Sequence, residues 1–313
     1  MTLASHVRTL GRGPGRSRSL AFDEARDAMA EMLSGDAAPE SVGALLMLLR
    51  MKGEETQEIA GFVSAAQESL PELPPVDLDW SSYAAGRTRG LPWFLLSARL
   101  VAASGHRVLM HGFNGIDGAV RDGLAPAGVP VAEAPTEVGR LLDADNLAYL
   151  PLETISPALF HLLGLRPKFN LRSCVNTVCR MFNPARAPVS VQGVFHPPYR
   201  LLQSDAAALL GWDAMTVIKG GGGEFERNPA KPVAAFGLRG GAAWEKTEPA
   251  LIEVATRMND GPDPTTTLAG LWSGEQRDSY AEAVVIGTAA LALDALGVAN
   301  PLDTARNLWD DRG

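Results

Sequence analysis

The sequence predicts a mixed α/β protein in two unequal parts: a small all-helical N-terminal domain and a large α/β domain with a mainly parallel central sheet. Three observations predict this class. Amphipathic helical patterns follow one another from Phe22 onward, a segment with Pro71, Pro74 and Pro75 interrupts them, and short apolar segments then alternate with helical patterns. Such alternation is typical of a sheet whose parallel strands are joined by helices on both faces.

Composition is that of an ordinary soluble globular protein. The chain has 313 residues, of which 46% are hydrophobic and 20% charged, so it is long enough for a large core. No apolar run reaches the roughly 18 residues of a membrane span, and the N-terminus lacks the apolar core of a signal peptide. We therefore expect a cytoplasmic protein without membrane contact. Cys174 and Cys179 are too few for a disulfide framework or a structural zinc site.

The N-terminal part is expected to contain an arm and a helical domain. Residues 1–21 are rich in Gly, Arg and Ser and are predicted to be a mobile basic arm, and residues 22–73 to be the helical domain. Its helices are predicted over Phe22–Leu33, which ends at Ser34-Gly35, over Pro39–Met51, and from Thr56, whose side chain can cap a helix.

Residues 74–313 are expected to form the α/β domain. Strands are predicted over Arg107–Met110, Leu147–Leu150, Val189–Val194 and Met215–Ile218. Helices are predicted over Leu91–Ala103, Pro157–Leu163, Cys174–Phe182, Tyr199–Leu210 and Ser279–Leu296. Ligands of such folds bind at the carboxyl ends of the strands. The loops at His111-Gly112 and Lys219–Gly223 both follow strands and are therefore candidate site loops.

The protein is acidic overall, but its basic residues are clustered along the sequence. The net charge of −8 argues against nucleic acid, but half of the 28 basic residues lie in three windows without Asp or Glu. The windows are Met1–Phe22 with Arg8, Arg12, Arg16 and Arg18; Trp80–Ile116 with Arg87, Arg89, Arg99 and Arg107; and Thr154–Ser204 with Arg166, Lys168, Arg172, Arg180, Arg186 and Arg200. If the last two windows converge in the fold, they create a local positive surface. A dispersed set of solvated arginines is the alternative.

Six segments carry motifs in a characteristic order. They are Gly43–Glu54, Glu58–Gly61, Arg172–Asn176, Asn183–Ala185, Gly193–Pro197 and the predicted helix Tyr280–Leu296. In order and spacing they resemble anthranilate phosphoribosyltransferase, of glycosyl transferase family 3, over nearly the whole chain from about Phe22. The resemblance implies the nucleoside phosphorylase/phosphoribosyltransferase fold, with residues 154–186 packing on the helical domain and a homodimer through the N-terminal helices.

The family's phosphate-binding motifs are altered here. Its Gly-Thr-Gly-Gly-Asp loop, which cradles the pyrophosphate of phosphoribosyl pyrophosphate, corresponds to Ala85–Gly90, where Arg87 and Arg89 replace small or acidic residues. Glycine lets backbone N–H groups approach phosphate closely, so two arginines would crowd such a loop. They could still hold phosphate through their side chains. The family's Lys-His-Gly-Asn stretch appears as Met110–Asn114, with the lysine lost and Phe113 inserted.

The family's magnesium site is also incomplete. Its Asp-Glu pair aligns with Phe225-Glu226, and a hard divalent cation needs several oxygen ligands. We therefore expect no metal and no cofactor. If a residual site for magnesium with phosphoribosyl pyrophosphate exists, Glu224 and Glu226 are its candidate ligands. Arg172 aligns with the arginine that contacts anthranilate, which alone does not indicate anthranilate binding.

The glycine run Lys219-Gly220-Gly221-Gly222-Gly223 resembles the loop of the YbiB-type branch of this family. The resemblance implies loss of anthranilate transfer and binding of DNA and RNA with little sequence preference. Glycines after a strand can present N–H groups to phosphate, with the charge of Lys219 beside them and Arg227 extending the positive edge. A flexible turn is the alternative interpretation.

Two functions stay open at this stage. The first is sequence-independent binding of nucleic acid through a basic surface. The second is a divergent glycosyl or phosphoribosyltransferase that uses phosphoribosyl pyrophosphate and an unknown acceptor, so whether the chain is an enzyme stays open. His111 could be a phosphate ligand or an acid–base group, or a structural histidine. The predicted phosphate- or nucleic-acid-binding residues are Arg87, Arg89, His111, Arg166, Lys168, Arg172, Arg180, Arg186, Lys219, Gly220, Gly221, Gly222, Gly223 and Arg227.

Overall fold

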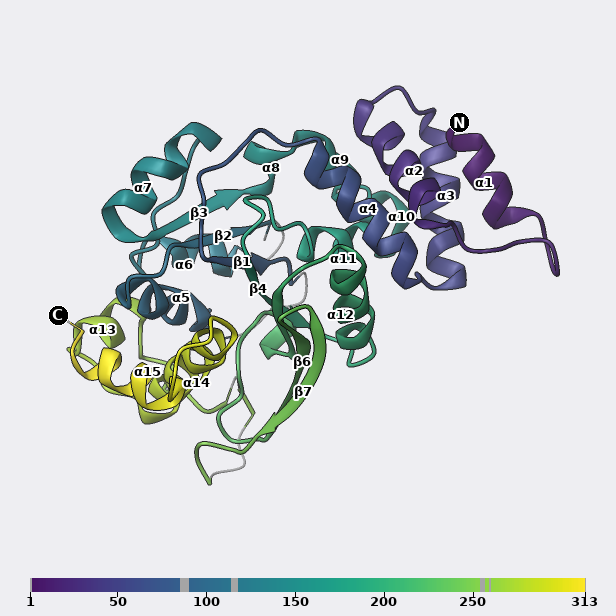
Figure 1. Ribbon diagram of the computed structural model, residues 1–313. Coiled ribbons are helices and arrows are strands. Elements are labelled where there is room, and N and C mark those ends of the chain that lie inside the picture. Colours follow the sequence, from purple (N-terminus) through teal and green to yellow (C-terminus); the bar gives the residue numbers. More distant parts are fainter. Residues whose placement is uncertain (1, 85–89, 114–117, 254–256, 259, 313) are drawn as a thin grey trace.

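The computed structural model describes residues 2–84, 90–113, 118–253, 257–258 and 260–312. It shows a helical domain beside a larger α/β domain, with the N-terminus at the outer end of the helical domain and the C-terminus at the far end of the α/β domain (Figure 1). This is the fold class that the sequence predicts. Arg87, Arg89 and residues 114–117 lie outside the described residues.

The helical domain is built from α1 (Leu3–Gly11), α2 (Phe22–Ser34), α3 (Pro39–Lys52) and α4 (Thr56–Glu68). Two segments from later in the chain pack beside it, α9 (Pro157–Leu163) and α10 (Arg166–Phe169) (Figure 1). One hydrophobic core joins both sets, because Leu46 and Phe62 share a cluster of buried side chains with Leu159 and Val178. The helical domain is therefore completed by α9 and α10, which the chain contributes after it has passed through the third strand of the α/β domain.

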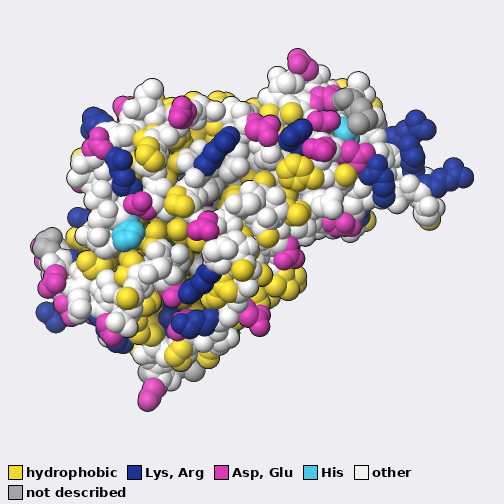
Figure 2. Space-filling view, in the orientation of Figure 1, with side chains coloured by type: hydrophobic (Ala, Val, Ile, Leu, Met, Phe, Trp, Pro, Cys, Tyr) yellow, Lys and Arg dark blue, Asp and Glu magenta, His cyan; other side chains and the backbone are white. Residues whose placement is uncertain are grey.

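The prediction of a mobile arm over residues 1–21 fails over residues 3–11, which form a helix. Residues 3–11 form α1, whose Leu3, His6 and Leu10 are buried, and Leu20 is buried as well. The sequence of α1 gives little indication of a packed helix, because its apolar residues are few, although they share one face at helical spacing. Arg18 pairs with Glu24 at the start of α2. Basic side chains nevertheless gather at this outer end of the molecule (Figure 2).

The α/β domain has a seven-stranded sheet with the order β3-β2-β1-β4-β5-β6-β7. Its strands are β1 (Leu78–Ser82), β2 (Val108–Gly112), β3 (Leu147–Pro151), β4 (Val189–Val194), β5 (Ala214–Lys219), β6 (Val233–Arg239) and β7 (Ala242–Glu248). The first five strands are parallel, and β6 and β7 are antiparallel. The four strands predicted from the sequence are confirmed as β2 to β5, whereas β1, β6 and β7 were not predicted.

Helices cover both faces of this sheet. They are α5 (Phe94–Ala103), α6 (Ala119–Leu124), α7 (Val138–Asp145), α8 (Leu152–Ile155), α11 (Val175–Arg180), α12 (Tyr199–Leu209), α13 (Leu268–Ser273), α14 (Ser279–Ala295) and α15 (Pro301–Asp310). On one face, α5 and α14 pack on Trp80 and Met110. On the other, the buried residues of α11 and α12 join the core of the helical domain. Within the described residues, no helix is both long and apolar enough to cross a bilayer.

Candidate functional site

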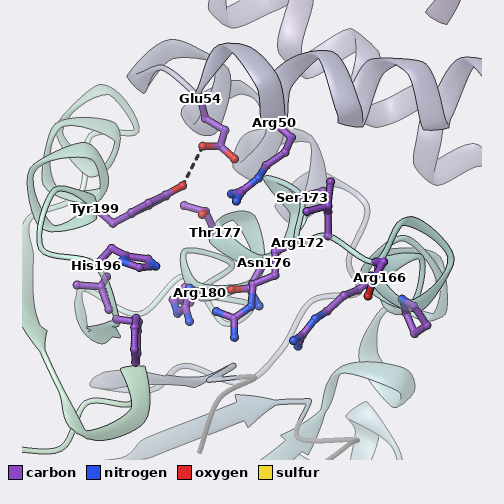
Figure 3. A pocket seen from close by; sticks show the side chains of 15 residues that line it. Arg50, Glu54, Arg166, Arg172, Ser173, Asn176, Thr177, Arg180, His196 and Tyr199 are labelled. Atoms are coloured by element: carbon purple, nitrogen blue, oxygen red, sulfur yellow. Dashed lines mark hydrogen bonds between the residues drawn. The ribbon is translucent and has the colours of Figure 1, made fainter.

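A cavity of about 630 Å³ lies where the helical domain meets the carboxyl ends of the strands. The end of α3 supplies Arg50, and the turn after it supplies Glu54. The segment from α10 to α11 supplies one wall, and the residues after β4 supply the opposite one (Figure 3). The full lining is Arg50, Glu54, Arg166, Pro167, Asn170, Leu171, Arg172, Ser173, Asn176, Thr177, Arg180, Val194, Phe195, His196 and Tyr199. We call this space the arginine cavity.

Four arginines give the arginine cavity its charge. Burial lowers the pKa of Arg172, and the charges of Arg166 and Arg50 lower it further. Burial also lowers the pKa of Arg180; Glu224 opposes this effect and Arg172 adds to it. Like charges held this close disfavour one another, so an anion that enters the cavity is stabilised by all four. Among the described residues of the lining, Glu54 is the only acid.

Arg180 is the most deeply buried of the four, with 7% of its surface exposed. Its Nη1 donates to Asn176 Oδ1 at 2.8 Å, and Asn176 Nδ2 donates to the carbonyl of Tyr83 at 3.3 Å. Its Nε is buried and has no hydrogen-bond partner among the described residues. Leaving such a buried donor unsatisfied costs about 1–3 kcal/mol.

Tyr199 and Glu54 close one side of the arginine cavity. Tyr199 Oη donates to Glu54 Oε2 at 3.1 Å, which joins α12 to the turn after α3 (Figure 3). Burial and the adjacent Glu54 carboxylate raise the pKa of Tyr199 to about 12. The bond therefore holds the two domains together on this side and keeps the only acidic side chain of the lining occupied.

The structure brings three of the predicted basic residues together and leaves others apart. Arg166, Arg172 and Arg180 line the arginine cavity. Lys168 is exposed on α10 without lining it, and Lys219 is exposed at the end of β5. Arg186 lies in the turn before β4, at the opposite end of that strand from the cavity, and does not line it.

The second acid-free window does not converge as expected in its described part. Arg99 lies over the ring of Trp272 at 4.0 Å and donates to the carbonyl of Ala127. Arg107 pairs with Asp143 on α7. Both arginines therefore stabilise the α/β domain and do not extend the arginine cavity.

The glycine run does not offer a phosphate cradle. The N–H groups of Gly220, Gly221 and Gly223 donate to the carbonyls of Val194, Glu226 and Gly220, at 3.3, 2.9 and 3.1 Å. A Cβ atom at Gly220 would lie 1.6 Å from the carbonyl oxygen of Glu224, and Gly222 and Gly223 have φ of 64° and 94°. The run is glycine because the chain turns back on itself there. Three of the four glycine N–H groups are therefore used within the chain, and this geometry does not support the predicted phosphate role of the run.

His111 and Arg227 are both buried and both have partners within the chain. His111 is fully buried: its Nδ1 lies 2.8 Å from Tyr83 Oη and its Nε2 lies 3.0 Å from Asp79 Oδ1. Arg227 is 3% exposed and donates to the carbonyl of Pro249. Among the described residues, both side chains are therefore directed into the protein.

The residues around the expected magnesium position do not fit a metal ion. Glu224 Oε1 accepts from the Ser82 hydroxyl and from the Ala84 N–H, both at 3.0 Å, and Glu226 Oε2 accepts from the Phe94 N–H at 3.0 Å. Phe225 is fully buried, with its ring 5.3 Å from that of Trp80 and perpendicular to it. The described residues contain no group of three or more His, Cys, Asp or Glu side chains that could hold a metal ion.

Of the lining, only Arg166, Arg172 and Arg180 were predicted from the sequence; five of the residues that were missed are Arg50, Glu54, Asn176, His196 and Tyr199. Four of them lie inside segments that resemble the family, so the sequence itself marks these segments as candidates for the site. The local sequence does not show their place in the site, because Arg50 and Glu54 lie in the helical domain. They become neighbours of Arg172 only when the chain folds back along α10.

Comparisons with known proteins follow the same division into domains. The helical bundle domain of a glycosyl transferase family matches residues 5–70, and the a/b domain of a glycosyl transferase family matches residues 94–307. Both domains are thus those of a glycosyl transferase.

Similarity to individual proteins shows which glycosyl transferase family this is. The chain is 31% identical over 224 residues to anthranilate phosphoribosyltransferase of Desulforudis audaxviator, which is 70% of this chain and 65% of that one. It is 29% identical to the enzyme of Chromohalobacter salexigens, over 74% of this chain and 69% of that one. The chain thus spans about two thirds of the length of these relatives. It belongs to glycosyl transferase family 3, as a homologue of anthranilate phosphoribosyltransferase.

Solved structures show the same fold. Anthranilate phosphoribosyltransferase from Thermus thermophilus has a TM-score of 0.79 at 22% identity, with 98% of this chain and 94% of that one covered. The Saccharomyces cerevisiae enzyme in complex with PRPP and Mg has a TM-score of 0.78 at 16% identity, with 99% and 93% covered.

Proposed function

We propose that this chain no longer transfers phosphoribose to anthranilate and instead binds the phosphates of DNA or RNA without sequence specificity. The observation that carries the proposal is the arginine cavity. Arg50, Arg166, Arg172 and Arg180 share one space, with Glu54 as the one acid among its described lining residues. A resemblance to the YbiB-type branch supports the same proposal.

The loss of transferase chemistry is supported by what fills the neighbouring positions. Phosphoribosyl transfer depends on stabilising the departing pyrophosphate, for which transferases use metal ions and N–H groups. Here Phe225 is a core residue, Glu224 and Glu226 hold backbone N–H groups, and three glycine N–H groups are used within the chain. Such a site attracts phosphate through side chains and lacks the means to activate it.

Arginine side chains account for the expected lack of specificity. A guanidinium binds a phosphate through two parallel hydrogen bonds, and it reads no base when it does so. Each neutralised phosphate also releases counterions, so affinity falls as salt rises. Four contacts to a single strand predict about a 50-fold loss of affinity between 50 and 200 mM salt.

Fluorescence anisotropy with a labelled 20-nucleotide strand tests this proposal. Arg172→Ala is expected to weaken binding and to make the salt dependence shallower, by about 0.7 in the slope of log affinity against log salt. Arg140→Ala is the matched control, because Arg140 is exposed on α7, away from the cavity. Affinity that does not change with salt, or no binding at 50 mM salt, contradicts the proposal.

A divergent transferase is the second candidate. The volume of the arginine cavity, about 630 Å³, is within the usual range for small-molecule sites of about 300–1,000 Å³. The similarity of the chain to anthranilate phosphoribosyltransferases favours the same idea. Calorimetric titration with phosphoribosyl pyrophosphate and magnesium tests it. Saturable binding that disappears in Arg172→Ala would favour a transferase with an acceptor other than anthranilate.

We also propose a homodimer through the N-terminal helices, the arrangement that the family resemblance implies. Two arginine cavities on one particle would let a long strand contact both, which raises affinity without new contacts. Sedimentation equilibrium of the chain alone, at several concentrations, measures this directly. A monomer at all concentrations contradicts it.

A further inference from the structure

An exposed aromatic ring stands at the edge of the arginine cavity. Phe195 follows β4 directly, lines the cavity, and keeps 51% of its surface exposed. Large apolar side chains that are exposed singly are common and need no explanation. The position of Phe195 is different, because it shares one wall with His196 and faces a space that contains four arginines.

The ring is held from behind by the glycine run and by its neighbour. A Cβ atom placed on Gly223 would lie 3.4 Å from Phe195 Cβ and 3.6 Å from Ala84 Cβ, so the backbone of residue 223 packs against the base of this side chain. The ring of His196 meets that of Phe195 edge to face, with centroids 5.0 Å apart and planes at 80°. Phe195 is therefore supported on one side and open on the other.

The two walls of the cavity offer different chemistry. His196 and Tyr199 lie on one side, and Arg166 and Arg172 lie on the other (Figure 3). A ligand that satisfies both sides needs negative charge together with a flat apolar face. A nucleotide with an unpaired base has both features, because every base has a π-face and stacks on aromatic rings regardless of its identity.

We propose that Phe195 is a stacking platform for an unpaired base and that the arginine cavity therefore prefers single-stranded nucleic acid to duplex. This inference rests on the proposed binding of nucleic acid and names the form that is bound. In a duplex each base is stacked between its neighbours, so its face is not available to Phe195 unless the helix is opened. The arginines hold the adjacent phosphates and the ring holds the base.

The experiment compares three labelled probes of 12 units at 50 mM salt: a thymidine strand, a strand of abasic tetrahydrofuran units, and a duplex of mixed sequence. The wild-type chain is expected to bind the thymidine strand roughly 5- to 150-fold more tightly than the abasic strand, the range for one stacked base. In Phe195→Ala this preference disappears, and in Phe195→Tyr it returns. Leu209→Ala, which also truncates an apolar residue about half exposed on α12, is expected to change nothing.

A spectroscopic measurement reports the stack itself. A single 2-aminopurine in the thymidine strand is expected to lose fluorescence on binding to the wild-type chain and to keep it with Phe195→Ala. Equal affinity for thymidine and abasic strands refutes stacking while phosphate binding stands. Duplex affinity equal to that of the thymidine strand refutes the single-strand preference. Absence of binding by all three probes refutes both this inference and the proposed function.

Discussion

Arg180 Nη1 donates a 2.8 Å hydrogen bond to Asn176 Oδ1, one turn earlier on α11, and both residues are buried. The other end of the Asn176 amide donates to the carbonyl of Tyr83, immediately after β1. One amide thus fixes the direction of a buried guanidinium and ties it to the end of a central strand. The geometry of the arginine cavity depends on this pair.

Asn176→Ala is expected to weaken both binding and folding. The substitution removes the acceptor of Arg180 Nη1 in a buried site, so stability should fall by about 1–3 kcal/mol. Affinity for a labelled single strand should fall severalfold, because the guanidinium is no longer aimed. Urea unfolding and anisotropy measure the two effects. Asn307→Ala, an exposed amide on α15, is the control, and equal behaviour of the two variants would contradict the role of Asn176.

Asp79→Ala is expected to destabilise the sheet strongly. Asp79 is 1% exposed, accepts from the Ser190 hydroxyl at 2.8 Å and lies 3.0 Å from His111 Nε2. Removal leaves two buried polar groups without their partner, at a cost of roughly 3–5 kcal/mol. Urea unfolding measures it, with the exposed Asp205→Ala as control. A loss below about 1 kcal/mol would mean that the network contributes little.

The same aspartate explains why β1 could not be predicted from the sequence. The strand Leu78–Ser82 is fully buried, yet three of its five residues are Asp or Ser, which are typical of loops. Their partners are Ser190, His111 and Glu224, from 32 to 142 residues away. By contrast, β4 was predicted with correct bounds, because apolar residues dominate its sequence and need no distant partner.

The site residues likewise divide into some that the sequence predicts and some that it does not. The acid-free window from Thr154 predicted Arg166, Arg172 and Arg180, because basic residues without carboxylates nearby in sequence indicate a positive surface. It also predicted Arg186, which lies at the opposite end of β4 from the cavity. Burial of His111 depends on Asp79 in another strand and on Tyr83 just after it, and the place of Arg50 depends on contacts between the domains. These are set by the fold and are not visible in local sequence.

Gly220→Ala is expected to be poorly tolerated. Its Cβ would lie 1.6 Å from the Glu224 carbonyl oxygen and 3.0 Å from the Glu226 nitrogen, both backbone atoms that cannot move alone. Overpacking of this kind typically costs about 1–3 kcal/mol, and a shift of backbone places this variant at the upper end. Thermal unfolding measures the effect. Gly139→Ala is the control, since its Cβ would meet only Pro74 Cγ at 3.9 Å; similar melting temperatures for both variants would contradict this packing.

Tyr199→Phe is expected to change how stability depends on alkaline pH. Burial and Glu54 raise the pKa of Tyr199 in the folded chain from 10.0 to about 12. A raised folded-state pKa contributes stability that is fully present below the unfolded value and is lost as pH rises through the folded value. The wild-type chain should therefore lose part of its stability between pH 10 and 12 through this residue.

The measurement is the difference in unfolding free energy between wild type and Tyr199→Phe from pH 8 to pH 12. Other tyrosines contribute equally to both proteins, so the difference isolates Tyr199. Below pH 10 the variant should be less stable by about 1 kcal/mol, because the hydrogen bond to Glu54 is lost. Above pH 10 the gap should shrink, since phenylalanine does not titrate. A gap that stays constant or widens up to pH 12 would show that the phenol does not hold its proton against Glu54 as the contact requires.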